Sequence, residues 1–184
     1  MADIVRADKQ GAPGKFWRQR ASTYGYKEVG TVRDTVVVSV TPTDLETTAL
    51  DSGDVAHTAV LNFADVVAQN GQSGVIEKLI VVDKDAQGID GELWLFSTSP
   101  TIPAADAAWS ISDADAAKVV AIIRTATDGV WFASALNKIG QVGGVDIPFK
   151  CDAADVDLYG AWVVRGTPTY TASGLTFNLT VARD

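Results

Sequence analysis

The amino-acid sequence predicts an all-β fold, an antiparallel β-sandwich preceded by an extended N-terminal arm. From Thr31 onward, short β-branched runs are separated by Gly, Pro, Asp and Thr, which is the pattern of strands joined by turns. Several of these runs alternate between apolar and polar residues, as half-buried strands do, and helical periodicity is scarce. Among the sandwich architectures we favour the jelly-roll. A chain of 184 residues is long enough to bury a core of its own.

Two runs show the alternation most clearly. Near the start of the body three valines share one face: Val36, Val38 and Val40. Near the C-terminus four apolar residues share a face that is opposed by Thr and Asn: Leu175, Phe177, Leu179 and Val181. The runs at 75–82 and 119–123 are apolar on both faces, which predicts central strands covered on both sides. Further strands are expected at 92–97, 130–133, 145–149 and 157–165, giving eight or nine in all.

Two short helices and one turn complete the expected elements. Residues 63–69 are expected to form a short helix, and Ser112 followed by Asp115 outlines a capping box at the start of a second one. The glycine-rich segment 140–144 lacks the Lys-Ser/Thr of a phosphate-binding loop, so we interpret it as a hairpin or connecting turn.

Charge divides the chain into a basic arm, residues 1–30, and an acidic body, residues 31–184. The arm has six basic and three acidic residues, a net charge of +3, whereas the body has nine basic and twenty acidic residues, a net charge of −11. An acidic body repels nucleic acid and anionic membranes, so neither is an expected partner. The arm either reaches across a neighbouring protein surface or is a poorly ordered, solvated terminus, and the sequence leaves both readings open.

Other features of the composition concern the cellular compartment. The single cysteine, Cys151, excludes an internal disulfide and fits a reducing environment. No apolar run approaches the ~20 residues of a membrane-spanning helix, and the first residues lack the apolar core of a secretory signal. We therefore expect the protein to be made and assembled in a cytoplasm.

The candidates for catalysis are few. His57 is the only histidine, and no recognisable motif surrounds it, so we favour a structural role. Cys151 has no second cysteine or histidine nearby in the sequence and is interpreted as a small buried apolar residue. We expect no enzymatic activity, no catalytic residue and no cofactor.

The segment from Asp83 to Gly88 resembles the first half of an EF-hand calcium loop. The required glutamate at the twelfth position is replaced by Trp94, and the flanking runs are strands, so a tight turn explains the residues better. A weak calcium site at Asp83, Asp85 and Asp90 is the alternative.

The aromatic residues provide candidates for binding. Trp94 and Trp162 lie within expected strands and are predicted to be core residues, whereas Trp17 lies in the basic arm, where it is the preferred interface anchor. The residues expected to contact a neighbouring protein surface all lie in the arm: Lys15, Phe16, Trp17, Arg18, Arg20, Tyr24 and Tyr26.

Several short motifs between residues 75 and 184 together resemble the head-decoration (cement) proteins of tailed bacteriophages. They are an Asp-rich turn, an aromatic strand, a Pro-Thr pair, an acidic capped turn and a closing strand: Asp83-Lys-Asp85 with Gly88, Leu93 to Phe96, Pro100-Thr101, Asp106, Ser112-Asp-Ala-Asp115, Leu158-Tyr159-Gly160 and Val163-Val164-Arg165-Gly166. The resemblance implies a β-sandwich, often a jelly-roll, that assembles as a homo-oligomer on the outer surface of the phage head.

These expectations lead to a hypothesis about function. The protein is expected to be a structural virion protein that cements the head by bridging subunits of the major capsid protein, arranged as a homotrimer at threefold positions. The alternative is a head-fibre or tail-associated adhesion module that binds host polysaccharide. A hydrolytic enzyme is a third, disfavoured possibility.

Overall fold

The computed structural model describes residues 34–183 of the chain. This part contains nine strands and two four-residue helices, joined by loops. The strands are β1 (Asp34–Val40), β2 (Leu61–Phe63), β3 (Ser73–Asp83), β4 (Gly91–Phe96), β5 (Val119–Arg124), β6 (Gly129–Ala133), β7 (Lys138–Lys150), β8 (Leu158–Val164) and β9 (Leu175–Arg183). The helices are α1 (Asp113–Ala116) and α2 (Thr125–Asp128). Within these residues, neither helix has the length to cross a membrane.

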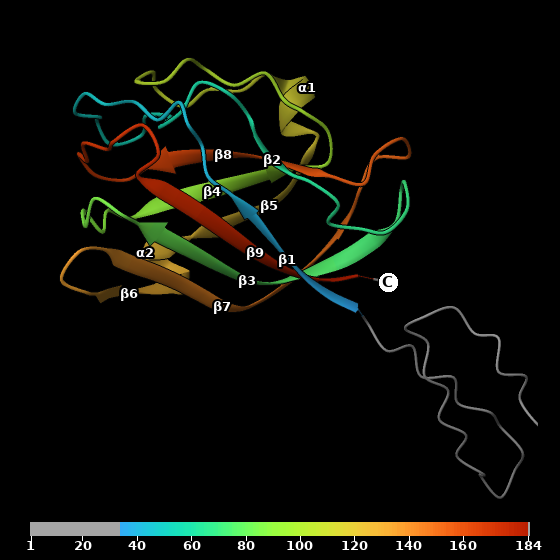
Figure 1. The fold of residues 1–184 in the computed structure, drawn as a ribbon. Helices are drawn as coiled ribbons and strands as arrows, with labels where there is room; N and C mark the ends of the chain where they lie inside the picture. The colour runs from blue at the N-terminus through green and yellow to red at the C-terminus, as the bar shows by residue number, and fades with distance from the viewer. Residues whose placement is uncertain (1–33, 184) are drawn as a thin grey trace, which may run out of the picture.

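The strands form two antiparallel sheets that pack against each other, which confirms the predicted β-sandwich. The larger sheet has the order β1-β9-β3-β7-β6 and the smaller sheet the order β2-β8-β4-β5. Figure 1 shows the two layers, with β8 and β4 in one and β9, β3 and β7 in the other. Most connections between the described strands cross from one sheet to the other. Of these described strands, only two consecutive pairs are hydrogen-bonded to each other, β4–β5 and β6–β7.

The core lies between the sheets and contains the alternating residues that the sequence predicts. Four residues of β9 are almost fully buried: Leu175, Phe177, Leu179 and Val181. The predicted valine row of β1 is half-buried and pairs with this row in antiparallel register. From the opposite sheet, Trp162 of β8 meets Phe177 with 5.3 Å between ring centroids. The period-2 pattern therefore identified correctly which face of β1 and of β9 is buried.

The two strands predicted to be central and covered on both faces differ from that prediction. β3 is central, but residues Val75, Ile80 and Val82 of its outer face are only half-buried. β5 is wrongly predicted, since it is an edge strand of the smaller sheet. Its Ala121 and Ile123 are buried in the core, and its other apolar residues are half-buried, with Val120 packed against the core. An apolar residue on an outer face can thus reflect partial cover as well as full burial.

The segment 140–144, interpreted as a turn, lies inside the thirteen-residue strand β7. Gly140 is paired on both sides, with β3 and with β6, and Gly143 is paired with β3, so these two glycines lie in the strand. The ladder to β3 is irregular at Gly144, where φ is +65°, and the register shifts between Ile76 and Lys78. The glycines therefore allow a β-bulge in β7 and the close approach of Trp131 over Gly140.

The helix expected at 63–69 is also wrong. Phe63 ends β2, and the chain then forms turns, with φ of +55° at Asp65. Val66 and Val67 are buried, so their apolar character serves a loop that covers the core. The predicted capped helix is confirmed, because the Ser112 hydroxyl accepts a hydrogen bond from the backbone N–H of Asp115 at the start of α1.

Close packing around Trp162 leads to a prediction about Gly91. A Cβ atom at Gly91 would overlap the buried indole of Trp162, whereas at Gly143 the nearest atom, in the Gln141 side chain, is 3.9 Å away. We expect Gly91→Ala to lower the free energy of unfolding by about 2–3 kcal/mol, because the core must shift. The matched control Gly143→Ala is expected to stay within about 0.5 kcal/mol of the wild type in chemical denaturation. Equal effects of the two variants would contradict this account.

Candidate functional site

The residues predicted to contact a capsid or a neighbouring subunit, from Lys15 to Tyr26, lie outside the described residues, so that prediction stays a prediction. The body begins with β1, whose first residue, Asp34, pairs with Arg183 at the end of β9. The site candidates that the structure does describe are the polar residues of the body and its exposed surface.

His57 is fully buried, and the backbone holds both of its ring nitrogens. Nδ1 lies 2.6 Å from the carbonyl oxygen of Ala59, and Nε2 accepts a hydrogen bond of 2.9 Å from the backbone N–H of Trp162. Because an amide N–H can only donate, Nε2 is unprotonated and Nδ1 carries the proton. Burial lowers the pKa of His57, which keeps the ring neutral. The side chain therefore connects the 54–57 segment to β8.

Cys151 is buried, as the sequence predicts. Its Sγ donates a hydrogen bond of 3.4 Å to the carbonyl oxygen of Asp157. Burial, together with the nearby carboxylates of Asp155 and Asp157, raises the pKa of the thiol to about 11. Such a thiol is almost wholly protonated at neutral pH and is a poor nucleophile.

The segment Asp83 to Gly88 is the predicted tight turn, and it links β3 to β4. The buried carboxylate of Asp83 accepts hydrogen bonds from the backbone N–H of Asp85 at 3.0 Å and of Gly88 at 2.5 Å. The carboxylate of Asp85 instead accepts from the Thr171 backbone at 2.8 Å, and that of Asp90 accepts from the Trp131 indole at 3.0 Å. The three carboxylates thus serve separate partners, and residues 34–183 contain no cluster of three potential metal ligands.

Glu92 is another carboxylate held by several partners. Its two oxygens contact Arg124 Nε at 3.2 Å and an Arg165 terminal nitrogen at 2.6 Å, and the Trp94 indole also donates to it at 3.2 Å. Burial alone would raise the pKa of Glu92, but these hydrogen bonds and the two positive charges together lower it. The group is therefore an ionised cross-link between β4, β5 and the end of β8.

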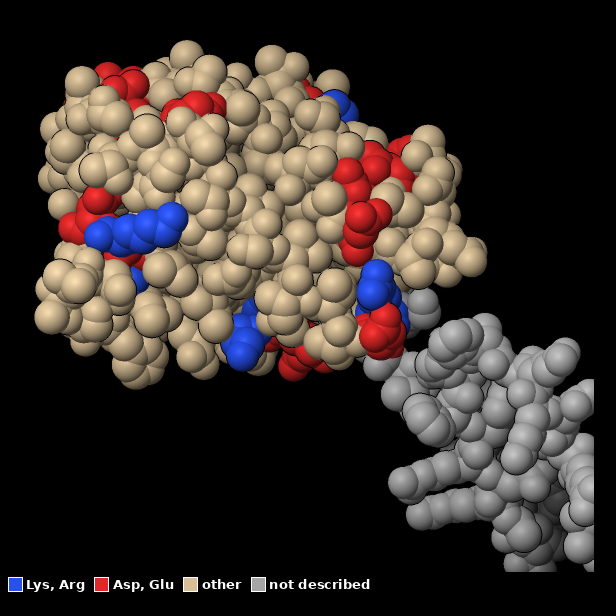
Figure 2. Space-filling model, viewed as in Figure 1, with Lys and Arg blue, Asp and Glu red and all other residues tan. Residues whose placement is uncertain are grey.

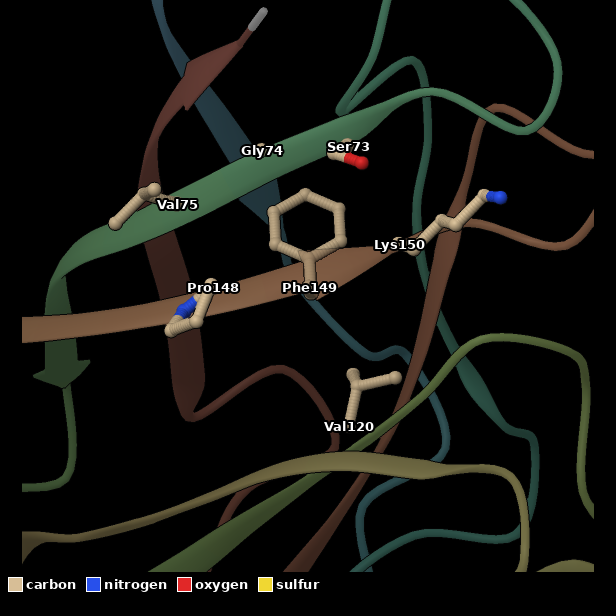
Figure 3. A pocket seen from close by; sticks show the side chains of 7 residues that line it. All are labelled: Ser73, Gly74, Val75, Val120, Pro148, Phe149 and Lys150. Atoms are coloured by element: carbon tan, nitrogen blue, oxygen red, sulfur yellow. The ribbon is translucent and has the colours of Figure 1, made fainter.

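Three open hollows lie on the described body, and their linings carry few titratable groups. The first hollow, of about 440 Å³, lies between the ends of β3 and β7 and is shown in Figure 3. Seven residues line it: Ser73, Gly74, Val75, Val120, Pro148, Phe149 and Lys150. The second, of about 390 Å³, contains the carboxylate of Asp128, and the third, of about 380 Å³, that of Asp115. Asp115 is paired with Lys118 at 2.7 Å. None of these three linings places two carboxylates together, so they lack the pair that glycoside hydrolysis uses.

The four tryptophans of the described part of the chain differ in burial: Trp162 is buried, as predicted, whereas Trp94, Trp109 and Trp131 are half-buried. Trp94, predicted to be a core residue, lies instead on the outer face of β4, half-buried, with its ring 5.3 Å from that of Trp109. Because each ring covers the other, the pair is a small aromatic cluster that protects the smaller sheet.

Sequence analysis missed an apolar surface at the β6 edge of the larger sheet. Four of the five large hydrophobic side chains that the described residues leave exposed lie there: Val130, Phe132, Leu136 and Ile139. We call these four residues the β6 patch. The sequence signal was present, since the nine residues from Gly129 to Asn137 contain no charged side chain. β6 lies within this run, and its outward side chains are apolar where polar residues normally face solvent. Such a surface indicates a contact site.

Figure 2 shows how charge is distributed on one face of the body, where Lys, Arg, Asp and Glu stand in small separate groups within a largely uncharged surface.

Comparison with known proteins adds no family: no family model matches the chain, and no curated protein matches it either.

The geometry of His57 generates a prediction about pH. The unfolded chain takes up a proton at His57 near pH 6.5, whereas the folded chain resists protonation to lower pH. Lowering the pH below 6.5 therefore favours unfolding, by up to about 1.4 kcal/mol per pH unit. We expect the free energy of unfolding to be flat from pH 8 to pH 7 and to fall between about pH 6.5 and 5.5, a range above the usual carboxyl pKa values.

The control is His57→Gln, which has no group that titrates in this range, since His57 is the only histidine. The variant is expected to be less stable than the wild type at pH 8 and to lose the slope between pH 6.5 and 5.5. Denaturant titrations at several pH values measure both effects. A slope that persists in His57→Gln would assign it to another group.

Proposed function

We propose that this chain is a non-enzymatic structural protein of a tailed-phage virion, which decorates the outer surface of the head and bridges neighbouring subunits of the major capsid protein. The observation that carries the proposal is the use of the buried polar groups. Five buried polar or charged residues of the described part of the chain each bind a protein partner: His57, Asp83, Glu92, Asp115 and Thr125. Two buried side-chain nitrogens in that part, Trp162 Nε1 and Arg183 Nε, have no hydrogen-bond partner. The five side chains hold loops and strands together by hydrogen bonds and ion pairs, as a rigid scaffold requires.

The path of the chain supports a jelly-roll. With β6 set aside, the strands enter the larger and smaller sheets in the order large, small, large, small, small, large, small, large. This order agrees with the winding of an eight-stranded jelly-roll, a fold used by viral capsid proteins. In this view β6 is an addition to the edge of the larger sheet.

The motifs behind the resemblance to decoration proteins have structural roles here. The Asp83–Gly88 turn joins β3 to β4, the Ser112 cap begins α1, and Glu92 of β4 binds Arg165 after β8. Their spacing in the sequence therefore reflects how this sandwich is built. Because a shared fold does not by itself give a shared function, the step from fold to capsid decoration is the proposal.

The charge distribution supports the mode of attachment. Residues 1–30 carry +3 and the remainder −11, so the arm is attracted to an acidic surface on a neighbouring protein. Copies arranged as a homotrimer would present three arms around a threefold axis, and simultaneous engagement would strengthen binding without new contacts in each copy. Trp17, with Arg18 and Arg20, is the proposed anchor.

The first test is deletion of residues 2–30. We expect the truncated protein to keep a cooperative unfolding transition but to lose attachment to undecorated phage heads, with at least a tenfold fall in affinity, about 1.4 kcal/mol. Trp17→Ala and the double variant Arg18→Ala/Arg20→Ala are expected to weaken binding in the same direction. Co-sedimentation with purified heads measures all three.

The matched control removes two basic residues of the body, Lys84→Ala/Lys150→Ala, and is expected to bind as the wild type does. Undiminished binding by the truncated protein would reject the arm as the anchor. Failure of the full-length protein to bind heads, together with retention of defined oligosaccharides on a glycan array, would instead support the adhesion module.

A further inference from the structure

The β6 patch is a continuous surface and not a set of scattered side chains. Exposed fractions are 60% for Val130, 57% for Phe132, 81% for Leu136 and 37% for Ile139. Val130 and Phe132 are two residues apart on β6 and so share its outer face, while the inward Trp131 packs against the core. Leu136 lies in the turn between β6 and β7.

The strand register extends this surface across the sheet. Phe132 pairs with Ile139 of β7, and Ile139 pairs in turn with Val82 of β3. In the next row, Val130 pairs with Gln141, which pairs with Ile80. Cross-strand partners lie on the same face of a sheet, so the patch continues onto two half-buried apolar residues of β3.

The edge beside this patch lacks the features that normally prevent strands from associating. Within residues 34–183, β6 pairs with a strand on one side only, so its other side presents backbone donors and acceptors. Residues 129–137 contain neither a charge nor a proline. The other edges differ: β2 has three residues, β5 ends in Arg124 paired with Glu92, and β1 begins with Asp34 paired with Arg183 at 2.8 Å.

We propose that the β6 edge binds the β6 edge of a second copy of this chain, with the two strands antiparallel across a two-fold axis. The lack of charge at the β6 edge suits this occupant, whereas the net charge opposes contact between two copies elsewhere. Residues 34–183 carry eight basic and nineteen acidic side chains, so two bodies repel each other over most of their surface. A two-fold contact places identical segments against each other, which suits a segment without charge.

The area available agrees with a weak or moderate dimer. The exposed parts of the four side chains amount to roughly 400 Å² per copy, at the size of a patch that marks an interaction site. A standard interface buries about 800 Å² per partner, and an edge-to-edge contact covers only part of a patch that lies on the sheet face, so the contact is smaller than a standard interface. Dissociation constants in the micromolar range are therefore expected.

This contact is independent of the arm. In the register of the larger sheet, Asp34 lies with Arg183 and Gly74 at one end of β3, whereas Ala133 lies with Lys138 and Asp83 at the other. Figure 1 shows the same separation, with the β6–β7 connection and the start of β1 at opposite sides of the body. A two-fold contact between copies is also compatible with a trimer, because it would join one trimer to another.

The test compares two valines on opposite edges of the same sheet. Val130 on β6 and Val37 on β1 are 60% and 61% exposed and occupy outward positions, so Val130→Lys and Val37→Lys are matched in chemistry and exposure. Sedimentation velocity of the purified full chain, without capsids, measures association over roughly two decades of concentration around the micromolar range. We expect the wild type to form dimers, or even-numbered multiples, with at least a tenfold weaker association in Val130→Lys and no change in Val37→Lys.

Phe132→Lys is the second variant and is expected to act as Val130→Lys does, while circular dichroism and thermal unfolding establish that each variant is folded. A wild type that stays monomeric at every concentration would overturn the proposal. So would an odd-numbered oligomer that Val130→Lys leaves intact, or equal weakening by Val130→Lys and Val37→Lys. Because no capsid is present, these outcomes are separate from success or failure of capsid attachment.

Discussion

Trp162 is the residue on which most of the sandwich depends. Its ring meets Phe177 of the opposite sheet and lies over Gly91 of the neighbouring strand, while its backbone N–H is bound by His57 and its carbonyl by the N–H of Ala56. One position in β8 thus couples both sheets and the 54–57 segment. Burying an indole of this size stabilises the fold only where each neighbour leaves room, which explains a glycine at position 91 and a neutral histidine at position 57.

The sequence predicted those features of the fold that depend on local chemistry. The rows in β1 and β9 were identified because side chains alternate across a strand, and the α1 cap because Ser112 reaches an amide three residues away. The errors concern partners distant in the sequence. Gly140 and Gly143 lie in a strand because β3 pairs with both of them and β6 with Gly140. β5 is an edge because no described strand follows it in the sheet. His57 bonds to a residue 105 positions away, which no local pattern encodes.

The candidate site shows the same division. Local turn chemistry predicted that Asp83 binds nearby amides, and the single histidine and cysteine pointed to structural roles. The β6 patch required knowledge of the sheet order. An uncharged run of nine residues could equally cross the core, and only the position of β6 at the end of the order β1-β9-β3-β7-β6 places its outer side chains in solvent.

The two proposals place two different contacts at the two ends of one rigid sheet. β3 spans eleven residues, roughly 35 Å, and separates the end where β1 begins from the end that carries the β6–β7 connection. In these proposals the arm binds a capsid subunit at one end, and the β6 edge binds a second copy at the other. Each body would then connect two neighbouring proteins. Because the strands of the larger sheet are hydrogen-bonded in series, force applied at one end would pass through them to the other. A sandwich built in this way can bridge subunits without any chemistry at its surface.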